Sequence, residues 1–268
     1  MVKDKYSIIN WAEQEVLGQQ PTLDYWNDRS KESKKAFDIA DGNIDKLSTY
    51  VKNKGLEKHL VKIIHDYGIT LNGKWLSLAS GACFIEARLL RQNKNIEKIV
   101  CVELSRHRIS EFAPIILKHY GIEPWRVDLC FGSFYDINAG DNTFDFVLLC
   151  QAFHHAFEPF RLLKEIKRVL KRNGRVIIIG ERFFSCKQVL SRTAKYIVKY
   201  ILNYKNFRSN RIFFPSWRAI FPIDERKGDH HYSKKMYSQL FKKAGFSYKH
   251  SVLKSHRIQG FVLTAQNI

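Results

Sequence analysis

The feature that most constrains the fold is an alternation of short apolar runs with amphipathic stretches across residues 75–181. Alternating strands and helices with short connections form a parallel sheet whose crossovers are right-handed. The runs are apolar along nearly their whole length, which is typical of strands covered by helices on both faces. Five runs are predicted to be strands: Trp75–Ala79, Lys98–Val102, Arg126–Phe131, Phe144–Cys150 and Arg175–Gly180.

The pattern continues toward the end of the chain. Glu158–Leu170 is a predicted amphipathic helix, and Asn173-Gly174 is expected to end it before the fifth strand. Ser233 is a predicted N-cap of a further helix. Tyr248–Leu253 and Ile258–Thr264 are predicted final strands, close enough in sequence to pair as antiparallel neighbours.

Two segments break the alternation. Residues 1–74 are predicted to be a helical extension, with helices at Trp11–Leu17 and at Asp45–Tyr67, the latter interrupted near Gly55. Lys187–Tyr204 has the spacing of an amphipathic helix, and the tract that follows is aromatic and basic. We therefore divide the chain into an extension or cap (1–74), a Rossmann-like core (75–181), a basic aromatic insertion or substrate cap (182–232) and a return to the core (233–268).

Charge and composition limit the partners. The formal net charge of +19 attracts anions such as nucleic acid, an acidic membrane surface or a phosphorylated small molecule, without choosing among them. The sequence has no apolar run of transmembrane length and no signal-peptide pattern at its start. Its five cysteines include no C-x-x-C and no zinc spacing, so we expect reduced thiols, a cytoplasmic location and no metal.

Candidate ligand-binding residues follow the predicted strands. In an open parallel sheet, ligands bind beyond the carboxyl ends of the strands where the strand order reverses. Ala79-Ser80-Gly81 ends the first strand and lets backbone N–H groups approach a ligand. Glu103 ends the second strand, 22 positions after Gly81, where an acid can accept both hydroxyls of a ribose.

The third and fourth strands end in further candidates. Gly132-Ser133-Phe134-Tyr135 follows the third strand, and Phe134 is placed to pack on an adenine ring. The segment 150–155 ends the fourth strand and carries His154 and His155. We expect this turn to face the reacting centre.

Part of the chain resembles a known protein family. Trp75–Glu181 resembles the class I S-adenosylmethionine-dependent methyltransferases, in particular the small-molecule methyltransferase type 11 group. The resemblance is strongest over Phe144–His155 and Leu162–Arg175. Gly228–Ser233 and Ala244–Phe246 look like the loop and helix that precede the family's last two strands.

The resemblance implies an α/β fold with a seven-stranded, mostly parallel sheet, helices on both faces and an antiparallel last strand. It implies S-adenosylmethionine as the cofactor. Carried over by position, the residues would contact the methionine part (Ala79, Ser80, Gly81), the ribose (Glu103), the adenine (Leu104, Ser133, Phe134) and the sulfonium end (Gln151).

The cofactor loop departs from the family pattern. The family's loop carries an acid two residues before its first glycine, and three glycines in all. The corresponding positions here are Ser77, Ala79, Gly81 and Cys83, so one glycine remains. Ser133 stands where an acid often follows the third strand. Serine can still donate a hydrogen bond to the cofactor, but without charge.

Methyl transfer from a sulfonium needs alignment of the acceptor and, for a hydroxyl, removal of its proton. Histidine titrates near neutral pH and suits that step. The candidate bases are His155 and His154, with Tyr135 as a weaker candidate. His230 and His231 are placed to approach the acceptor from the other side.

Several acceptors remain open. The basic, aromatic segment 182–227 favours a phosphorylated or nucleotide-linked acceptor, such as a precursor of bacterial surface polysaccharide. A rival is a helix lying on an anionic membrane, with a lipid acceptor. RNA is a third, although the turn Gln151-Ala152-Phe153-His154 lacks the Asn/Asp-Pro-Pro-aromatic pattern of base methylation. The fourth is a binding protein without catalysis.

Overall fold

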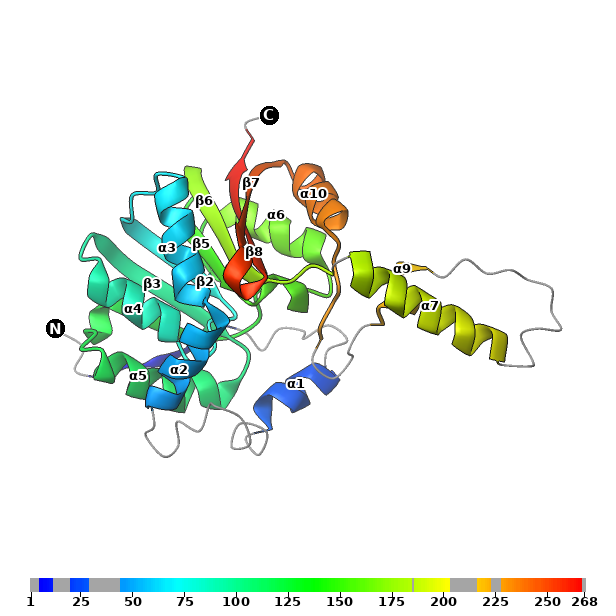
Figure 1. Cartoon of the computed structure of the whole chain (residues 1–268). Helices are drawn as coiled ribbons and strands as arrows, with labels where there is room; N and C mark the ends of the chain where they lie inside the picture. Colours follow the sequence, from blue (N-terminus) through cyan, green and yellow to red (C-terminus); the bar gives the residue numbers. More distant parts are fainter. Residues whose placement is uncertain are drawn as a thin grey trace.

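The computed structural model describes residues 5–11, 20–28, 44–184, 186–202, 216–222 and 228–266. Within these residues the strands form one eight-stranded sheet in the order β1-β4-β3-β2-β5-β6-β8-β7 (Figure 1). The strands are β1 (Ile8–Asn10), β2 (Gly73–Leu78), β3 (Ile96–Glu103), β4 (Val127–Phe131), β5 (Phe144–Cys150), β6 (Leu170–Glu181), β7 (Phe246–Leu253) and β8 (Ile258–Ala265).

The predicted fold class is confirmed, with one addition. Strands β2 to β8 correspond to the seven expected strands, and only β8 runs antiparallel to its neighbours β6 and β7. The eighth strand, β1, lies in the extension that we predicted to be helical. It pairs in parallel with the free edge of β4, where Ile8 faces Leu129. Three residues are too few to show the alternation by which a strand is recognised.

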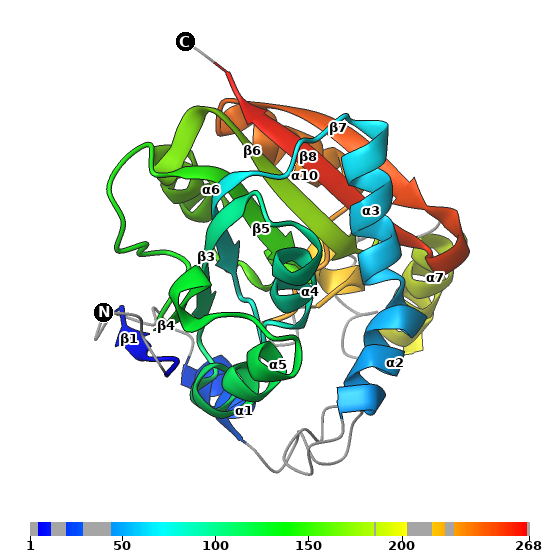
Figure 2. The same ribbon diagram turned by 90° about the vertical axis from the view of Figure 1, so that its left-hand side faces the viewer.

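Helices cover both faces of the sheet (Figure 2). Helices α3, α4 and α5 lie on one face, and α6 and α10 lie on the other. The helices described are α1 (Gln20–Asn27), α2 (Ile44–Lys54), α3 (Leu56–Asp66), α4 (Phe84–Gln92), α5 (Ala113–His119), α6 (Pro159–Val169), α7 (Cys186–Leu202), α9 (Trp217–Ile220) and α10 (Lys234–Lys243).

Each strand contributes to both cores because successive side chains point to opposite faces. Trp75 of β2 belongs to the core under α3 and α4, where its ring stacks on Phe146 of β5 at 4.5 Å. Its neighbour Leu76 belongs to the core under α6 and α10, together with Val147 of β5. This arrangement explains why the strands are apolar at nearly every position.

The predicted break near Gly55 is present. Gly55 separates α2 from α3 with a left-handed backbone (φ +69°), a conformation that glycine adopts without strain. A Cβ at this position would lie 2.5 Å from Cγ of His256. The helix predicted at Trp11–Leu17 falls, apart from Trp11, outside the described residues.

The predicted helix stop at Asn173-Gly174 is wrong. Helix α6 already ends at Val169, and β6 starts at Leu170 and runs through both residues. Gly174 permits this because its α-carbon packs closely on β5. A Cβ there would lie 2.9 Å from the carbonyl oxygen of Asp145 and 2.7 Å from Cδ1 of Leu170.

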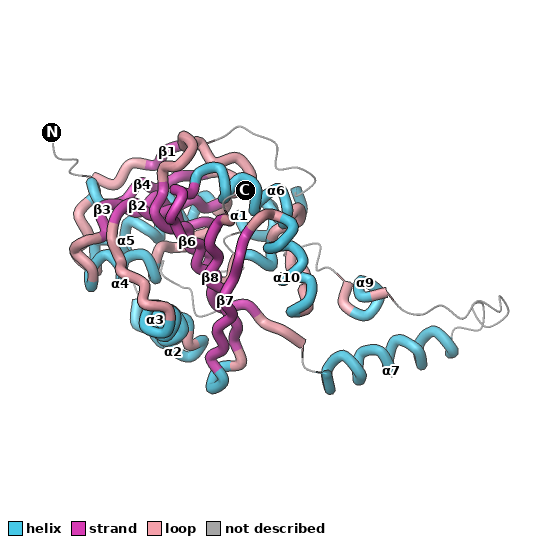
Figure 3. The backbone as a smooth tube through the Cα atoms, turned by 90° about the horizontal axis from the view of Figure 1, so that it is seen from above, coloured by secondary structure: helices cyan, strands magenta, loops and turns pink. Residues whose placement is uncertain are grey.

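Helix α7 extends away from the sheet beside the short helix α9 (Figures 1 and 3). It corresponds to the amphipathic helix predicted from Lys187. Helix α10 begins at the predicted N-cap, where Oγ of Ser233 accepts a hydrogen bond from the backbone N–H of Met236 (3.3 Å). Among the described residues, no helix is long and apolar enough to cross a membrane.

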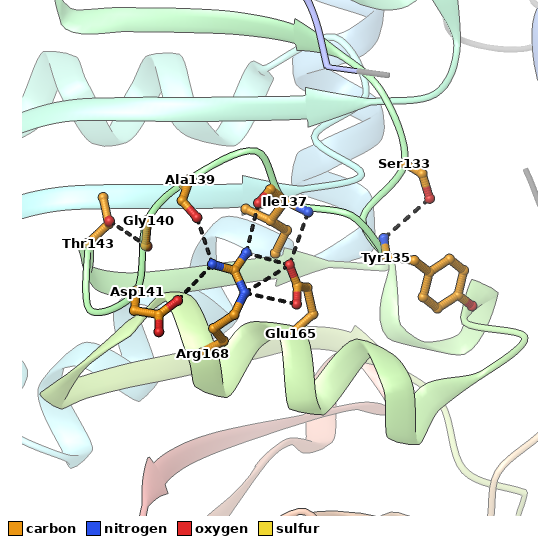
Figure 4. A network of polar contacts seen from close by, with 9 residues as sticks. All are labelled: Ser133, Tyr135, Ile137, Ala139, Gly140, Asp141, Thr143, Glu165 and Arg168. Atoms are coloured by element: carbon orange, nitrogen blue, oxygen red, sulfur yellow. Dashed lines mark hydrogen bonds and ion pairs between the residues drawn. The ribbon is translucent and has the colours of Figure 1, made fainter. Parts of the chain in front are cut away.

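Arg168 of α6 makes several contacts that tie the loop between β4 and β5 to this helix (Figure 4). Its guanidinium donates to the carbonyl oxygens of Ile137 (2.8 Å) and Ala139 (2.7 Å) and pairs with Glu165 and Asp141. Hydrogen bonds to Glu165, and then to Asp141, raise the pKa of Arg168. The loop that carries the candidate residues after β4 therefore has a fixed end.

We predict that Arg168→Ala lowers the free energy of unfolding by roughly 2 kcal/mol, because it leaves two carbonyls and two carboxylates without their shared donor. Urea unfolding followed by circular dichroism measures this. Arg161→Ala is the matched control on the same helix. Its ion pair with Glu158 is solvent-exposed, so a change below about 0.5 kcal/mol is expected. Equal effects of both variants would contradict the anchoring role of Arg168.

Candidate functional site

The candidate site lies where the strand order reverses, between β2 and β5. From β2 the chain proceeds outward to β3 and β4 in one direction, while β5 and β6 lie on the other side. The carboxyl ends of these strands carry the predicted cofactor residues and the candidate bases Tyr135, His154 and His155, whereas His230 and His231 lie in the segment before α10. Such a reversal leaves an opening between the diverging loops.

The loop after β2 keeps a glycine-like backbone without most of the glycines. Ala79 (φ +53°), Gly81 (φ +58°) and Cys83 (φ +57°) are all left-handed. The two non-glycine residues adopt this conformation at a cost of roughly 1 kcal/mol each. Compared with the three-glycine pattern, the loop therefore carries two additional side chains but keeps a left-handed backbone at all three positions.

Glu103 joins this loop to the end of β3. Its Oε2 accepts a hydrogen bond from the backbone N–H of Gly81 (2.7 Å). Its Oε1 accepts from the N–H groups of Leu104 (3.0 Å) and Ser105 (2.8 Å). The structure thus brings together Gly81, Glu103 and Leu104, three of the predicted cofactor residues.

A buried acid that we did not predict lies behind the loop. Ser77 donates through Oγ to Oε1 of Glu86 on α4 (2.5 Å). Burial raises the pKa of Glu86 to about 7, against the hydrogen bond from Ser77. A carboxyl group therefore does stand beside the position where the family pattern has its acid. The available sequence signal was one acid, Glu86, in the largely apolar stretch Phe84–Leu90.

The residues after β4 form a compact turn. Oγ of Ser133 accepts from the N–H of Tyr135 (3.2 Å), and Phe134 is half-buried with its ring 4.7 Å from that of Tyr135. The phenol oxygen of Tyr135 accepts from the N–H of Glu158 at the start of α6 (2.9 Å). This contact gives Tyr135 an anchoring position, and its role as a base stays a prediction.

The turn after β5 places the two histidines. Gln151 has a left-handed backbone (φ +52°), and its N–H donates to the carbonyl of Ile179 on β6 (2.9 Å). A single helical turn follows at Phe153–His155. Phe153 is fully buried against Tyr237 and Phe241 of α10, and this packing fixes the turn that carries the two histidines.

His154 is held by a fully buried carboxylate. Its Nδ1 lies 3.2 and 3.1 Å from the two oxygens of Glu181 at the end of β6. The hydroxyl of Tyr237 donates to Glu181 as well (2.5 Å). Burial alone would lower the pKa of His154, but the charge and hydrogen bond of Glu181 outweigh it and raise that pKa. The same contacts lower the pKa of Glu181 despite its burial.

His155 has the opposite character. Its Nδ1 lies 3.1 Å from Oδ1 of Asp229, at ion-pair distance but without hydrogen-bond alignment. The rings of His154 and His155 are 4.2 Å apart. Burial lowers the pKa of His155, the contact with Asp229 opposes this, and the charge of His154 lowers it further, with a net decrease. Adjacent groups with opposed pKa shifts are typical of acid–base pairs.

His230 and His231 flank this pair. The N–H of His230 donates to the carbonyl of His154 (2.8 Å), and burial lowers the pKa of His230 to about 4. The carbonyl of His231 accepts from Nε1 of Trp217 on α9 (2.6 Å). The backbone of His230 thus contacts the histidine pair and that of His231 contacts α9, while their approach to an acceptor stays a prediction.

Three of these side chains could hold a metal ion. One ligand atom from each of His154, His155 and Asp229 lies within 4.8 Å of the other two. Two imidazoles and a carboxylate form a donor set that Zn²⁺ accepts. The sequence analysis expected no metal because the chain has no C-x-x-C and no zinc spacing, and Asp229 is too distant from the histidines along the chain to form a local motif with them. Glu181 and Asp229 were missed as site residues for the same reason.

Helix α1 links the two halves of the site. The ring of Trp26 packs edge-on against His155 at 5.5 Å. Its carbonyl accepts from Oγ of Ser105, and Oδ1 of Asn27 accepts from the N–H of Arg106 (both 2.8 Å). The extension therefore contacts both the loop of Glu103 and the histidine pair. No motif in residues 20–28 indicated this contact.

We predict that Glu181→Gln lowers the pKa of His154 relative to the unmodified chain. The amide keeps the shape of the side chain but removes the charge that favours the imidazolium. Imidazole resonances followed by NMR across pH measure the shift. Asp229→Asn serves as the matched control and is expected to act first on His155. An unchanged titration of His154 in Glu181→Gln would contradict the assigned pairing.

Comparison with known proteins agrees with this geometry. Residues 76–178 match the family described as methyltransferase domain. A S-adenosylmethionine-dependent methyltransferase from Aquifex aeolicus has 18% identity and a TM-score of 0.55, over 82% of this chain and 96% of that one. A putative O-methyltransferase from Nostoc punctiforme has 18% identity and a TM-score of 0.56, over 81% and 58%.

The same fold also occurs with other chemistry. The [4+2]-cyclase SpnF has 13% identity and a TM-score of 0.57, over 78% of this chain and 81% of that one. No curated protein matches the chain. These structural similarities show the fold alone. Residues 76–178 match a methyltransferase domain, a family whose cofactor is S-adenosylmethionine, and the described chain has the fold that such methyltransferases share.

Proposed function

We propose that this chain transfers the methyl group of S-adenosylmethionine to a small anionic acceptor, phosphorylated or nucleotide-linked, such as a precursor of bacterial surface polysaccharide. The observation that carries the proposal is the pair His154 and His155, whose pKa values shift in opposite directions next to the strand-order reversal. One member of such a pair stays protonated while the other accepts a proton near neutral pH.

The cofactor would lie across the loops after β2, β3 and β4. Ala79, Ser80 and Gly81 would contact its methionine part, and Gln151 its sulfonium end. Leu104, Ser133 and Phe134 would surround the adenine. This assignment carries the family's roles to residues whose loops converge in the structure.

Glu103 would bind the ribose hydroxyls. A carboxylate offers about four acceptor positions. Backbone N–H groups use two on Oε1 and one on Oε2, so Oε2 keeps one for a hydroxyl. These three contacts also fix the carboxylate before the cofactor arrives, which lowers the entropy lost on binding.

When bound, S-adenosylmethionine supplies an activated methyl group and a neutral thioether leaving group. The Nε2 atom of His155 would accept the proton from the hydroxyl group of the methyl acceptor, since the Nδ1 atom of His155 faces Asp229. Asp229 would then stabilise the imidazolium. His154, kept protonated by Glu181, would hold its position and present a donor toward the acceptor. Trp26 would limit the access of water to His155.

Two arginines support an anionic acceptor. Arg182 follows Glu181 directly, and its charge acts on His154. Arg218 on α9 acts on His230 in the same way. Both side chains are solvent-exposed at the border of the histidine pair, where guanidinium groups can bind a phosphate through paired hydrogen bonds. Free thiols at Cys83, Cys101, Cys130 and Cys150 support a cytoplasmic location.

We predict that Glu103→Ala weakens S-adenosylmethionine binding about 10- to 100-fold, because it removes charged hydrogen bonds to the ribose and frees the loop of Gly81. Isothermal titration calorimetry measures the affinity. Glu97→Ala, at an exposed position on the same strand, is the matched control and is expected to bind as the unmodified chain does. Absence of binding by the unmodified chain would favour the alternative of a protein without catalysis.

We predict that labelled methyl groups are transferred to phosphorylated or nucleotide-linked sugars in preference to neutral sugars or random RNA. Arg218→Ala should raise the KM for the acceptor about tenfold or more through loss of a charge-assisted contact. His155→Gln should lower kcat by about 10²- to 10⁴-fold with little effect on cofactor affinity. Scintillation counting of separated products measures each value.

Two controls separate the roles within this assay. Chelation with EDTA should leave the rate unchanged if His155 acts as a base, whereas a loss restored by Zn²⁺ would assign His154, His155 and Asp229 to a metal. A loss of cofactor affinity in His155→Gln, with kcat preserved, would make His155 a structural residue. Preference for neutral acceptors would contradict the proposed substrate class.

A further inference from the structure

Helix α7 exposes a row of aliphatic side chains, which we call the aliphatic stripe. Its members lie seven to twelve positions from the first, so they share one side of the helix. Exposed aliphatic groups that gather on one surface mark a binding surface more often than a solvated one. The stripe consists of Leu190 (70% exposed), Ile197 (43%), Val198 (54%), Ile201 (52%) and Leu202 (78%).

The opposite side of α7 is the side that packs. Val189, Thr193, Tyr196 and Tyr200 are each only partly exposed, and the rings of Tyr196 and Tyr200 stack at 6.4 Å. Arg192 lies over Phe184 and Phe221, 4.9 Å from each ring centre, and fastens the helix to α9 and the segment after β6. The helix therefore has a fixed inner side and an exposed outer side.

The charges on α7 are all positive. The helix carries Lys187, Arg192, Lys195 and Lys199, and the sequence from 186 to 202 contains no acidic residue. All three lysines are exposed beside the aliphatic stripe. A helix with an apolar stripe bordered by lysines has the composition of helices that lie in the plane of an anionic bilayer.

The aliphatic side chains decide between the anionic partners. A nucleic acid would meet the lysines but would leave the stripe without contacts, since single-strand binding relies on aromatic stacking. A second copy of the chain would bring two sets of uncompensated cations together. An anionic bilayer accepts both features, with lysines at the phosphates and aliphatic groups among the acyl chains.

We propose that α7 is a docking surface for an anionic lipid bilayer, with the aliphatic stripe entering the membrane interface. The helix extends away from the sheet (Figures 1 and 3), and the members of the aliphatic stripe are exposed, so they are accessible to a flat surface. Helix α7 begins at Cys186, shortly after β6 ends at Glu181. Docking therefore brings the carboxyl end of β6 toward the membrane. The docking itself does not depend on the acceptor.

Sedimentation with vesicles tests the proposal. The full chain should bind vesicles of phosphatidylglycerol and phosphatidylcholine, and should bind pure phosphatidylcholine at least tenfold more weakly. The double variant Leu190→Glu with Val198→Glu should lose at least about tenfold in partitioning, because it removes apolar contacts and adds repulsion. Each replacement of Lys187, Lys195 or Lys199 by Gln should cost about fivefold.

Val61→Glu is the matched control, since Val61 is equally exposed (56%) but lies on α3. It should bind as the unmodified chain does, and thermal unfolding checks that every variant is folded. Equal binding by the double variant, or no binding by the unmodified chain, would overturn the proposal. So would a dimer that the double variant dissociates, or binding of random RNA that depends on Leu190 and Val198. No readout involves methyl transfer, so the proposed function is tested separately.

Discussion

The interaction on which the rest of the site depends is the buried carboxylate of Glu181. Moving an ion from water into a protein interior costs several kcal/mol, so a carboxylate with no solvent exposure needs strong partners. Glu181 obtains them from His154 after β5 and from Tyr237 on α10. The pKa of Glu181 is lowered and that of His154 is raised, so the attraction between the two side chains outweighs the cost of burying their charges. The stabilisation from Glu181 is lost as the pH falls below 4.5, the ordinary pKa of a glutamate side chain. The stabilisation from His154 is lost as the pH rises beyond 6.5, the ordinary pKa of histidine. Both residues therefore stabilise the fold between these two pH values.

A second carboxylate organises the other half of the site in a different way. Glu103 accepts hydrogen bonds from three backbone N–H groups, and through them it ties the loop after β2 to the loop after β3. Helix α1 then connects this half to the histidine pair through Trp26 and Asn27. The left-handed backbone at Ala79 and Cys83 is sustained by this frame, since an unsupported loop would relax out of that conformation.

The strand pattern predicted β2 to β6 and β8 because these strands are buried on both faces over most of their length, which makes their sequences nearly continuously apolar. The edge strand β7 instead alternates buried and more exposed residues. The proximity of Gly81 and Glu103 was predictable for a related reason: consecutive parallel strands end at one edge, so spacing along the chain translates into distance. The partners of the histidines were not predictable in this way. Glu181 and Asp229 reach His154 and His155 from the far end of a strand and from a loop much later in the chain. Glu86 restores a carboxyl near Ser77 from a helix, which no positional comparison with a family motif detects. Strand β1 depends on a free sheet edge, a tertiary feature without a local sequence signal.

The charges around the histidine pair fit the proposed reaction as a whole. Glu181 favours the protonated form of His154, and the lowered pKa of His155 favours its neutral form beside Asp229. In the proposed complex, the carboxylates of Glu181 and Asp229 would favour a cation such as the sulfonium near this pair. In the proposed reaction the sulfonium charge would disappear, and the proton accepted by His155 would place a positive charge beside Asp229. The positive charge would thus move only from the sulfonium to the imidazole of His155, and the net charge of the site would change little. An anionic group on the acceptor would disturb this balance if it lay among the histidines, so it is better bound by Arg182 and Arg218 at the border, where solvent screens it from Asp229.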